Sequence, residues 1–155
     1  TRAGRNWRPF LILRSAIGVG AVAALGWLLV SSSAPAQLTF SAYDPALIAS
    51  ATEDHKPLLL DFRADWCIPC REMDHSTFAD PSVVKAAKDF VRLRADLTKQ
   101  DDVNDAIISK FRIQGVPTTL IIDGDGHEKV RKVGYVGAQE MLADLRSVDG
   151  SSKPQ

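Results

Sequence analysis

Clusters of basic side chains are missing from most of this 155-residue sequence, and their absence excludes one large class of function. Of the 19 lysines and arginines, four precede Ala36, and these are the only charges there: Arg2, Arg5, Arg8 and Arg14. The remainder carries 15 basic and 19 acidic side chains, a net charge of −4. A mildly acidic domain without a basic patch is a poor candidate for binding nucleic acid. We therefore expect no nucleic-acid partner.

Cysteine is almost absent and histidine is rare, which argues against a metal site. The two cysteines, Cys67 and Cys70, are separated by two residues, and the three histidines are His55, His75 and His127. A structural zinc site needs four ligands, and these spacings match no common zinc finger. A purely structural disulfide over so short a loop would contribute little stability. We therefore expect no metal and no cofactor besides the cysteine pair, which we interpret as redox-active.

Charge is also scarce in an apolar segment near the N-terminus. Residues 10–30 contain a single charge, that of Arg14, which lies near enough to one end to reach the membrane interface. About 20 apolar residues are what a helix needs to cross a bilayer. Because arginines precede this segment and none follows it closely, the positive-inside rule predicts a cytoplasmic basic flank at 1–9. We interpret 10–30 as a transmembrane helix or signal-anchor, with everything after Ser31 outside the cytoplasm.

A cleaved signal peptide is the alternative, because the run Ala34-Pro35-Ala36 also fits an A-x-A cleavage site. Two observations favour a retained helix. The sequence begins with Thr1 rather than Met, as a piece of a longer protein would. Small residues at Ala16, Gly20 and Ala24 would let a membrane helix pack closely against its neighbours. Both interpretations place the folded domain on the same side of the membrane.

Strand and helix patterns alternate after a small, polar linker at 31–37. They predict one domain over 38–148 and a flexible tail at 149–155. The element order β-α-β-α-β-α-β-β-α gives an α/β fold, a central mixed β-sheet with helices on both faces. After a first strand near Leu38, helices are expected at 44–54, 71–75, 80–88, 101–111 and 138–148, and strands at 57–62, 90–95, 118–122 and 128–133.

The cysteine pair follows an apolar strand and opens a helix. The first thiol at a helix N-terminus faces unpaired backbone N–H groups and the positive end of the helix dipole, which stabilise its thiolate. The thiolate is the species that attacks a disulfide. Cys67 is therefore the expected nucleophile. Cys70, one turn later, is close enough to resolve the mixed disulfide.

A carboxylate stands inside the apolar strand that leads to the cysteines. Burial penalises the ionised form of a carboxyl group, so the pKa of Asp61 should rise. Buried carboxylates with perturbed pKa values concentrate at active sites. A surface-pointing or structurally satisfied aspartate is the alternative interpretation.

The sequence around the cysteines resembles the thioredoxin superfamily, and a thioredoxin fold is what that resemblance implies. More closely, residues 38–148 are similar to the C-terminal periplasmic domain of the DsbD family of transmembrane thiol:disulfide interchange proteins. The preceding membrane segment fits the last transmembrane helix of that family. The runs that carry the likeness are Leu59 to Cys67, Arg71-Glu72-Met73, Ser76 to Pro81 and Gly115 to Thr119.

The resemblance implies roles for residues around the dithiol. In thioredoxin-like proteins the proline that matches Pro117 is cis and lies against the cysteines, and the residue matching Val116 offers its backbone to the partner. Trp66 would be a partly exposed platform beside the thiols. The acid matching Asp61 lies beneath the cysteines and helps to move protons. Asp74 corresponds to a second nearby acid, whose charge would raise the thiol pKa.

Several of these positions also have an ordinary structural interpretation. Pro117 could be a trans turn proline, Trp66 a core aromatic and Asp74 a solvated helix residue. Pro69 matches the proline between the cysteines of ordinary thioredoxin and is associated there with a reducing pair and substrate contact. Ile68 replaces the usual glycine, so the reduction potential could lie anywhere between roughly −180 and −270 mV.

The resemblance implies a thiol:disulfide oxidoreductase, a protein-disulfide reductase on the periplasmic side of the bacterial inner membrane. It would pass electrons from a membrane-domain dithiol to extracytoplasmic thiol-disulfide proteins, and on to disulfide isomerase or cytochrome c maturation clients. One alternative is a free-standing anchored or secreted thioredoxin-like protein for cytochrome c maturation or thiol repair. An oxidant that installs disulfides and a non-enzymatic binding module are the others.

Overall fold

The computed structural model describes residues 37–149. The predicted basic flank at 1–9, the predicted membrane helix at 10–30 and the linker at 31–36 lie outside the described residues. Residues 150–155 of the predicted tail lie outside them too. Within residues 37–149, no helix has the length and apolar character needed to span a membrane. The membrane helix and the domain boundaries stay predictions.

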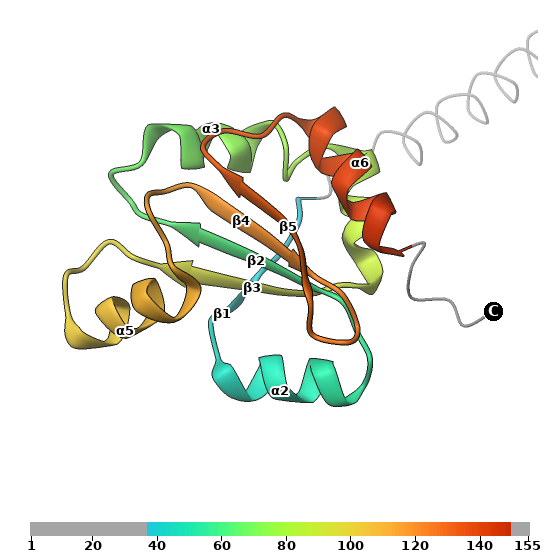
Figure 1. The fold of residues 1–155 in the computed structure, drawn as a ribbon. Helices are drawn as coiled ribbons and strands as arrows, with labels where there is room; N and C mark the ends of the chain where they lie inside the picture. Colours follow the sequence, from blue (N-terminus) through green and yellow to red (C-terminus); the bar gives the residue numbers. More distant parts are fainter. Residues whose placement is uncertain (1–36, 150–155) are drawn as a thin grey trace, which may run out of the picture. The chain divides into compact units, whose positions relative to one another are not determined.

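A five-stranded mixed sheet forms the centre of the domain (Figure 1). Its strand order is β1-β3-β2-β4-β5, with β1, β3 and β2 parallel and β4 and β5 antiparallel to their neighbours. The strands are β1 (Ser41–Ala42), β2 (Leu58–Arg63), β3 (Val91–Asp96), β4 (Thr118–Ile122) and β5 (Glu128–Val133). The predicted α/β fold with a central mixed sheet is confirmed.

Helices cover both faces of this sheet. Figure 1 shows α3 and α6 on one side and α2 and α5 on the other. The α4 helix packs with α3 and α6, because Met73, Val83 and Met141 share one buried cluster with Leu59 of β2. The helices are α2 (Pro45–Glu53), α3 (Ile68–His75), α4 (Pro81–Ala86) followed by the 3₁₀ turn η1 (Ala87–Asp89), α5 (Asp102–Phe111) and α6 (Ala138–Asp149).

Three of the helices begin after an aspartate that caps them. The carboxylates of Asp44, Asp80 and Asp101 accept hydrogen bonds from N–H groups in the first turns of α2, α4 and α5. Each satisfies donors that have no partner within the helix. A proline follows two of these caps, where its fixed φ suits the first helical turn.

Strand β2 is buried on both faces and joins the two cores. Leu58, Leu60 and Phe62 belong to the cluster beneath α2 and α5, whereas Leu59 belongs to the cluster beneath α3, α4 and α6. Each of these side chains is at most 1% exposed. Side chains alternate along a strand, so Asp61 shares the face of Leu59. The strand that leads to the cysteines thus carries a carboxylate into the α3 side of the core.

The structure differs from the predicted elements at several ends. Helix α3 begins at Ile68 instead of residue 71, because the Cys67 sulfur accepts the N–H of Cys70 and caps the helix. The predicted helix at 80–88 becomes α4 and the 3₁₀ turn. On α5, Val103 matched the apolar spacing but is 69% exposed, while Ile107 is 8% exposed. The buried side chains of α5 are those of Asn104 and Ile107, so Val103 lies on the solvent side of the helix.

The turn between β4 and β5 packs tightly against the end of α2. Asp123 accepts hydrogen bonds from the N–H groups of Asp125 and His127, which closes the turn. A Cβ added to Gly124 would lie 2.4 Å from the carbonyl oxygen of His55, a residue with a left-handed φ of 53°. Glycine is required at this position because the neighbour is backbone and has little freedom to move.

Substitution of Gly124 by alanine tests this contact. We expect Gly124→Ala to lower the free energy of unfolding by about 1–3 kcal/mol, as overpacking typically does. Gly137→Ala is the matched control, because a Cβ there has no heavy atom within 4 Å, and it should stay within about 0.5 kcal/mol of wild type. Urea unfolding with equal slopes measures both. Equal midpoints for the two variants would contradict the close approach.

Candidate active site

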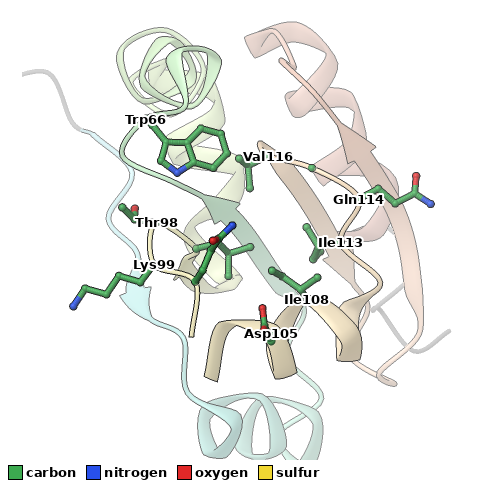
Figure 2. Close-up of a pocket in the computed structure, with 11 residues that line it drawn as sticks. Trp66, Thr98, Lys99, Asp105, Ile108, Ile113, Gln114 and Val116 are labelled. Carbon is green, nitrogen blue, oxygen red and sulfur yellow. The ribbon is translucent and has the colours of Figure 1, made fainter. Parts of the chain in front are cut away.

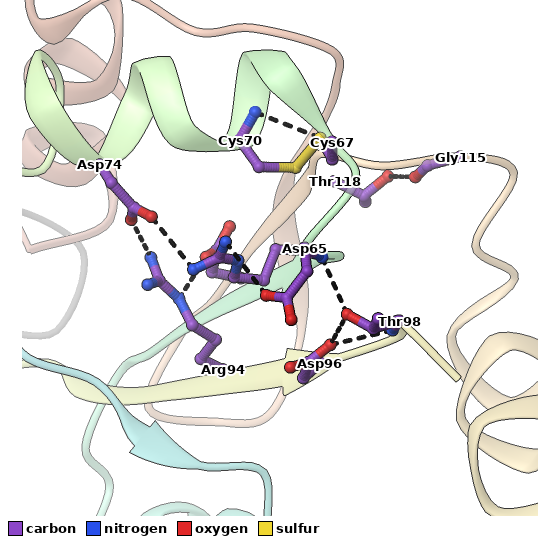
Figure 3. Close-up of a disulfide and its surroundings, with 11 residues drawn as sticks. Asp65, Cys67, Cys70, Asp74, Arg94, Asp96, Thr98, Gly115 and Thr118 are labelled. Carbon is purple, nitrogen blue, oxygen red and sulfur yellow. Dashed lines mark hydrogen bonds and ion pairs between the residues drawn. A yellow bond between two sulfur atoms is a disulfide. The ribbon is translucent and has the colours of Figure 1, made fainter. Parts of the chain in front are cut away.

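The two cysteines lie where β2 passes into α3. They form a disulfide, and Figure 3 shows it at the first turn of the helix. Cys67 and Cys70 are only 3% and 4% exposed, but they are flanked by apolar side chains in solvent. Trp66 is 66% exposed and Ile68 is 69% exposed. Pro69, in the first turn of α3, is half-buried. A partner can therefore approach the disulfide over an exposed apolar rim.

The loop before β4 lies against the cysteines. The Val116–Pro117 peptide bond is cis, the geometry that the family resemblance implied. Val116 packs against the cluster formed by Ala64, Cys67 and Cys70. Two hydrogen bonds hold this loop at its ends: Gly134 N–H donates to the Pro117 carbonyl at 2.8 Å, and the Thr118 hydroxyl donates to the Gly115 carbonyl at 2.6 Å.

A groove of about 740 Å³ runs from the rim of the cysteine pair towards α5. Figure 2 shows Trp66 and Val116 at one end and Ile108 and Asp105 at the other. Leu97 adds to its apolar wall. The remaining lining is mixed, with Ile113 beside the polar side chains of Lys99 and Gln114. This groove therefore combines an apolar wall with polar side chains beside the cysteine pair.

Asp61 occupies a buried position beneath α3 and is 3% exposed. Its register partner on β3 is Arg94, whose Nε donates a hydrogen bond of 2.7 Å to Asp61 Oδ2. Thr119 stands opposite Asp61 on β4. Burial is the largest influence on the carboxyl group and raises the pKa of Asp61 from 3.8 to about 6, although Arg94 pulls it down. The rise predicted for this pKa is therefore present.

The same guanidinium connects Asp61 to a second carboxylate. Arg94 Nη2 contacts Asp74 Oδ1 at 2.7 Å, and Arg63 Nη1 contacts Asp74 Oδ2 at 3.2 Å. Figure 3 shows Asp74 reaching from α3 towards Arg94. Arg63 also lies 3.8 Å from the exposed Asp65. Asp74 is thus no solvated helix residue: its side chain is 14% exposed and is held by two arginines.

Sequence reasoning missed both arginines. Their signal was present, because alternate residues of the predicted strand at 90–95 are basic, and Arg94 falls beside Asp61 once β2 and β3 pair in parallel. Arg63 follows Asp61 by two residues and so lies on the same face of β2. Recognising this cluster required the register between two strands that are about 30 residues apart in the chain.

One group of potential metal ligands exists among residues 37–149. Ligand atoms of Asp123, Asp125 and His127 lie within 4.8 Å of one another. Asp123 is already engaged, because it accepts two backbone hydrogen bonds in the turn and forms an ion pair of 3.1 Å with Lys129. The group lies at the β4–β5 turn, whereas the cysteines lie at the opposite end of β2, so it is no part of this site.

Comparisons with known proteins agree with this geometry. A family model described as thioredoxin-like matches residues 39–124. The thiol:disulfide interchange protein DsbD of Ralstonia nicotianae is 38% identical over 107 residues, which cover 68% of this chain and 18% of that protein. DsbD of Escherichia coli K12 is 41% identical over 93 residues, 59% of this chain and 16% of that protein. The chain therefore spans less than a fifth of these relatives.

Solved structures give the same result at the level of the domain. The C-terminal domain of Neisseria meningitidis DsbD in its reduced form superposes with a TM-score of 0.60 at 27% identity, covering 70% of this chain and 99% of that one. The oxidised form of the same domain superposes with a TM-score of 0.59 at 28% identity, covering 71% of this chain and 99% of that one. The chain belongs to the thioredoxin-like family, and residues 37–149 are similar to the C-terminal domain of DsbD.

Proposed function

We propose that this domain is a protein-disulfide reductase on the periplasmic side of the bacterial inner membrane. It takes two electrons from a membrane-domain dithiol and gives them to periplasmic thiol-disulfide proteins. The observation that carries the proposal is the cysteine pair at the start of α3, set against the cis-proline loop. The likeness to part of the DsbD proteins, which are named thiol:disulfide interchange proteins, supports a role in thiol–disulfide exchange. Residues 10–30 would tether the domain to the membrane.

The exchange begins with the Cys67 thiolate. In the oxidised structure the Cys67 sulfur accepts the N–H of Cys70 at 3.2 Å, and the same N–H and helix dipole would favour a thiolate in the reduced form. The thiolate attacks a partner disulfide, one partner sulfur leaves as a thiolate, and a mixed disulfide forms. Cys70 then loses its proton and attacks the Cys67 sulfur. The internal disulfide forms, and the partner leaves with both electrons.

Asp61 accepts the proton of Cys70 in this scheme. A general base works best when its pKa lies near the operating pH. With a pKa of about 6, the Asp61 carboxyl is mostly ionised at pH 7 and still basic enough to accept a proton. It lies on the sheet face that α3 covers, and Asp74, one turn beyond Cys70, is joined to it through Arg94.

Partner binding uses the exposed rim and the groove. Trp66 and Pro69 flank the disulfide, and Val116, which packs against the cysteines and precedes Pro117, would offer its backbone to the partner. An extended partner segment would pair with Val116 and lie along the apolar wall. Binding through backbone groups and shallow apolar contacts suits a domain that exchanges with more than one thiol protein.

Replacing either cysteine by serine separates the attack on the partner disulfide from the resolution of the mixed disulfide. We expect Cys67→Ser to reduce insulin no faster than buffer, because no nucleophile remains at the exposed rim. Cys70→Ser should still attack but should stop at the mixed disulfide, which mass spectrometry under non-reducing conditions detects. Circular dichroism controls for folding. A folded Cys67→Ser domain with wild-type insulin reduction would contradict the assignment and favour a binding module.

Substitution of Asp61 by asparagine tests the proton acceptor. We expect Asp61→Asn to slow the resolution of a preformed mixed disulfide at pH 7 by about 100-fold or more, the usual contribution of a general base. Attack by Cys67 on a partner disulfide should change much less, and it serves as the internal control. Rapid-quench single turnovers measure both steps. Equal slowing of the two steps would argue for a general loss of structure.

The raised pKa of Asp61 also predicts a pH dependence of stability. Because the folded pKa of about 6 lies above the ordinary value of 3.8, the folded state binds the proton more tightly. This group therefore stabilises the fold fully below about pH 4, and that stabilisation is lost as the pH rises through about 6, by up to about 3 kcal/mol. Urea unfolding of wild type and Asp61→Asn from pH 4 to pH 7 measures it. A stability difference that does not change with pH would contradict the raised pKa.

A further inference from the structure

The carboxylates of Asp61 and Asp74 both bind the guanidinium of Arg94 beneath α3. We propose that Arg94 is a positioning residue of the site, whose guanidinium binds Asp61 and Asp74 together and keeps Asp61 ionised at neutral pH. The inference rests on the proposed function, because it concerns the same proton acceptor. It adds the residue that fixes the pH range in which that acceptor works.

The contacts of Arg94 are short and use separate nitrogens. Nε donates to Asp61 Oδ2 and Nη2 donates to Asp74 Oδ1, both at 2.7 Å. Hydrogen bonds between ionised partners at this distance are among the stronger ones in proteins. A guanidinium presents its N–H groups in a fixed plane, so one arginine can bind a carboxylate on β2 and another on α3 at once. Lysine, with a single charged nitrogen, would not reproduce this geometry.

Packing fixes the position of the guanidinium. Its central carbon lies 4.3 Å from the centroid of the Phe40 ring and 5.6 Å from that of Phe78, and the Arg94 side chain is 22% exposed. Cation–π contacts of this kind hold the charged group over the rings. Arg94 is therefore held between two aromatic rings and two carboxylates, as a fixed charge next to a buried acid.

The other groups that face Asp61 cannot replace this charge. Asp74 on α3 is negative and pushes the Asp61 pKa upward. Arg63, on β2 itself, is directed to Asp74 and Asp65 and influences Asp61 less than Arg94 does. From β4, Thr119 contributes an uncharged hydroxyl. Without Arg94, a buried carboxyl beside a second carboxylate would hold its proton at pH 7 and could not accept one from Cys70.

The test compares pH profiles of the full chain, with insulin as the disulfide substrate. In wild type, the rate of reduction should fall as the pH drops below about 6. In Arg94→Gln the midpoint of this fall should move up by about 1–3 pH units, because the loss of an opposite charge in contact with a carboxyl group raises its pKa by about that much. The rate at pH 6 should then fall at least about tenfold and should recover towards wild type near pH 9. Arg94→Lys should give a smaller shift in the same direction.

A matched control stands two residues earlier on the same strand. Arg92 donates to the backbone carbonyls of Thr39, Ala87 and Lys88, and no carboxylate is among these partners. Arg92→Gln should leave the midpoint unchanged. In a variant that already carries Asp61→Asn, adding Arg94→Gln should not shift the midpoint of the rate any further. A uniform loss of rate at every pH, or an unmoved midpoint, would overturn the proposal if the pKa of Asp61 is also unchanged in folded Arg94→Gln.

The carboxyl ¹³C chemical shift of Asp61, followed by NMR against pH, separates this proposal from the proposed function. A higher Asp61 pKa in Arg94→Gln, or in Arg94→Lys if the glutamine variant does not fold, supports the electrostatic role even if insulin reduction does not depend on Asp61. In that case the proton-acceptor role fails and the positioning of Asp61 by Arg94 stands. An unchanged pKa in a folded variant overturns the proposal whatever the rates show.

Discussion

The burial of one carboxylate in the central strand is the constraint on which the rest of this site depends. Strand β2 places apolar side chains in both cores, and Asp61 between them is only 3% exposed. An ionised carboxylate there requires a fixed opposite charge, and the parallel pairing with β3 supplies it from Arg94. The register between β2 and β3 therefore determines which charge lies next to Asp61 as well as how the two strands pair.

The same strand determines where the sulfur chemistry occurs. A short connection after β2 brings Cys67 to the N-terminus of α3, where the backbone donors of the helix favour a thiolate. The cis-proline loop before β4 reaches the cysteines because β4 is the antiparallel neighbour of β2. The cysteine pair, the cis-proline loop and Asp61 thus lie on, or directly next to, two neighbouring strands of one sheet.

The sequence predicts much of this arrangement, and the limits of that prediction have a physical reason. Apolar runs, aspartate caps and the turn at Asp123 are local signals, so the element order and the mixed sheet could be predicted. The pair Cys67 and Cys70 was identifiable because the spacing and the strand–helix context are local too. Arg94 was missed because its partner depends on strand pairing across the chain, and the burial of Asp74 was left open for the same reason.

The equilibrium reduction potential of the Cys67–Cys70 pair is the measurement that tests the central claim most directly. Equilibration with glutathione and with thioredoxin, read out by mass spectrometry of alkylated protein, gives this potential. A reductase supplied with electrons from the cytoplasmic side should lie towards the thioredoxin value of about −270 mV. A value at or above about −180 mV, the range of disulfide isomerase, would contradict the account, and the domain would then be an oxidant or isomerase.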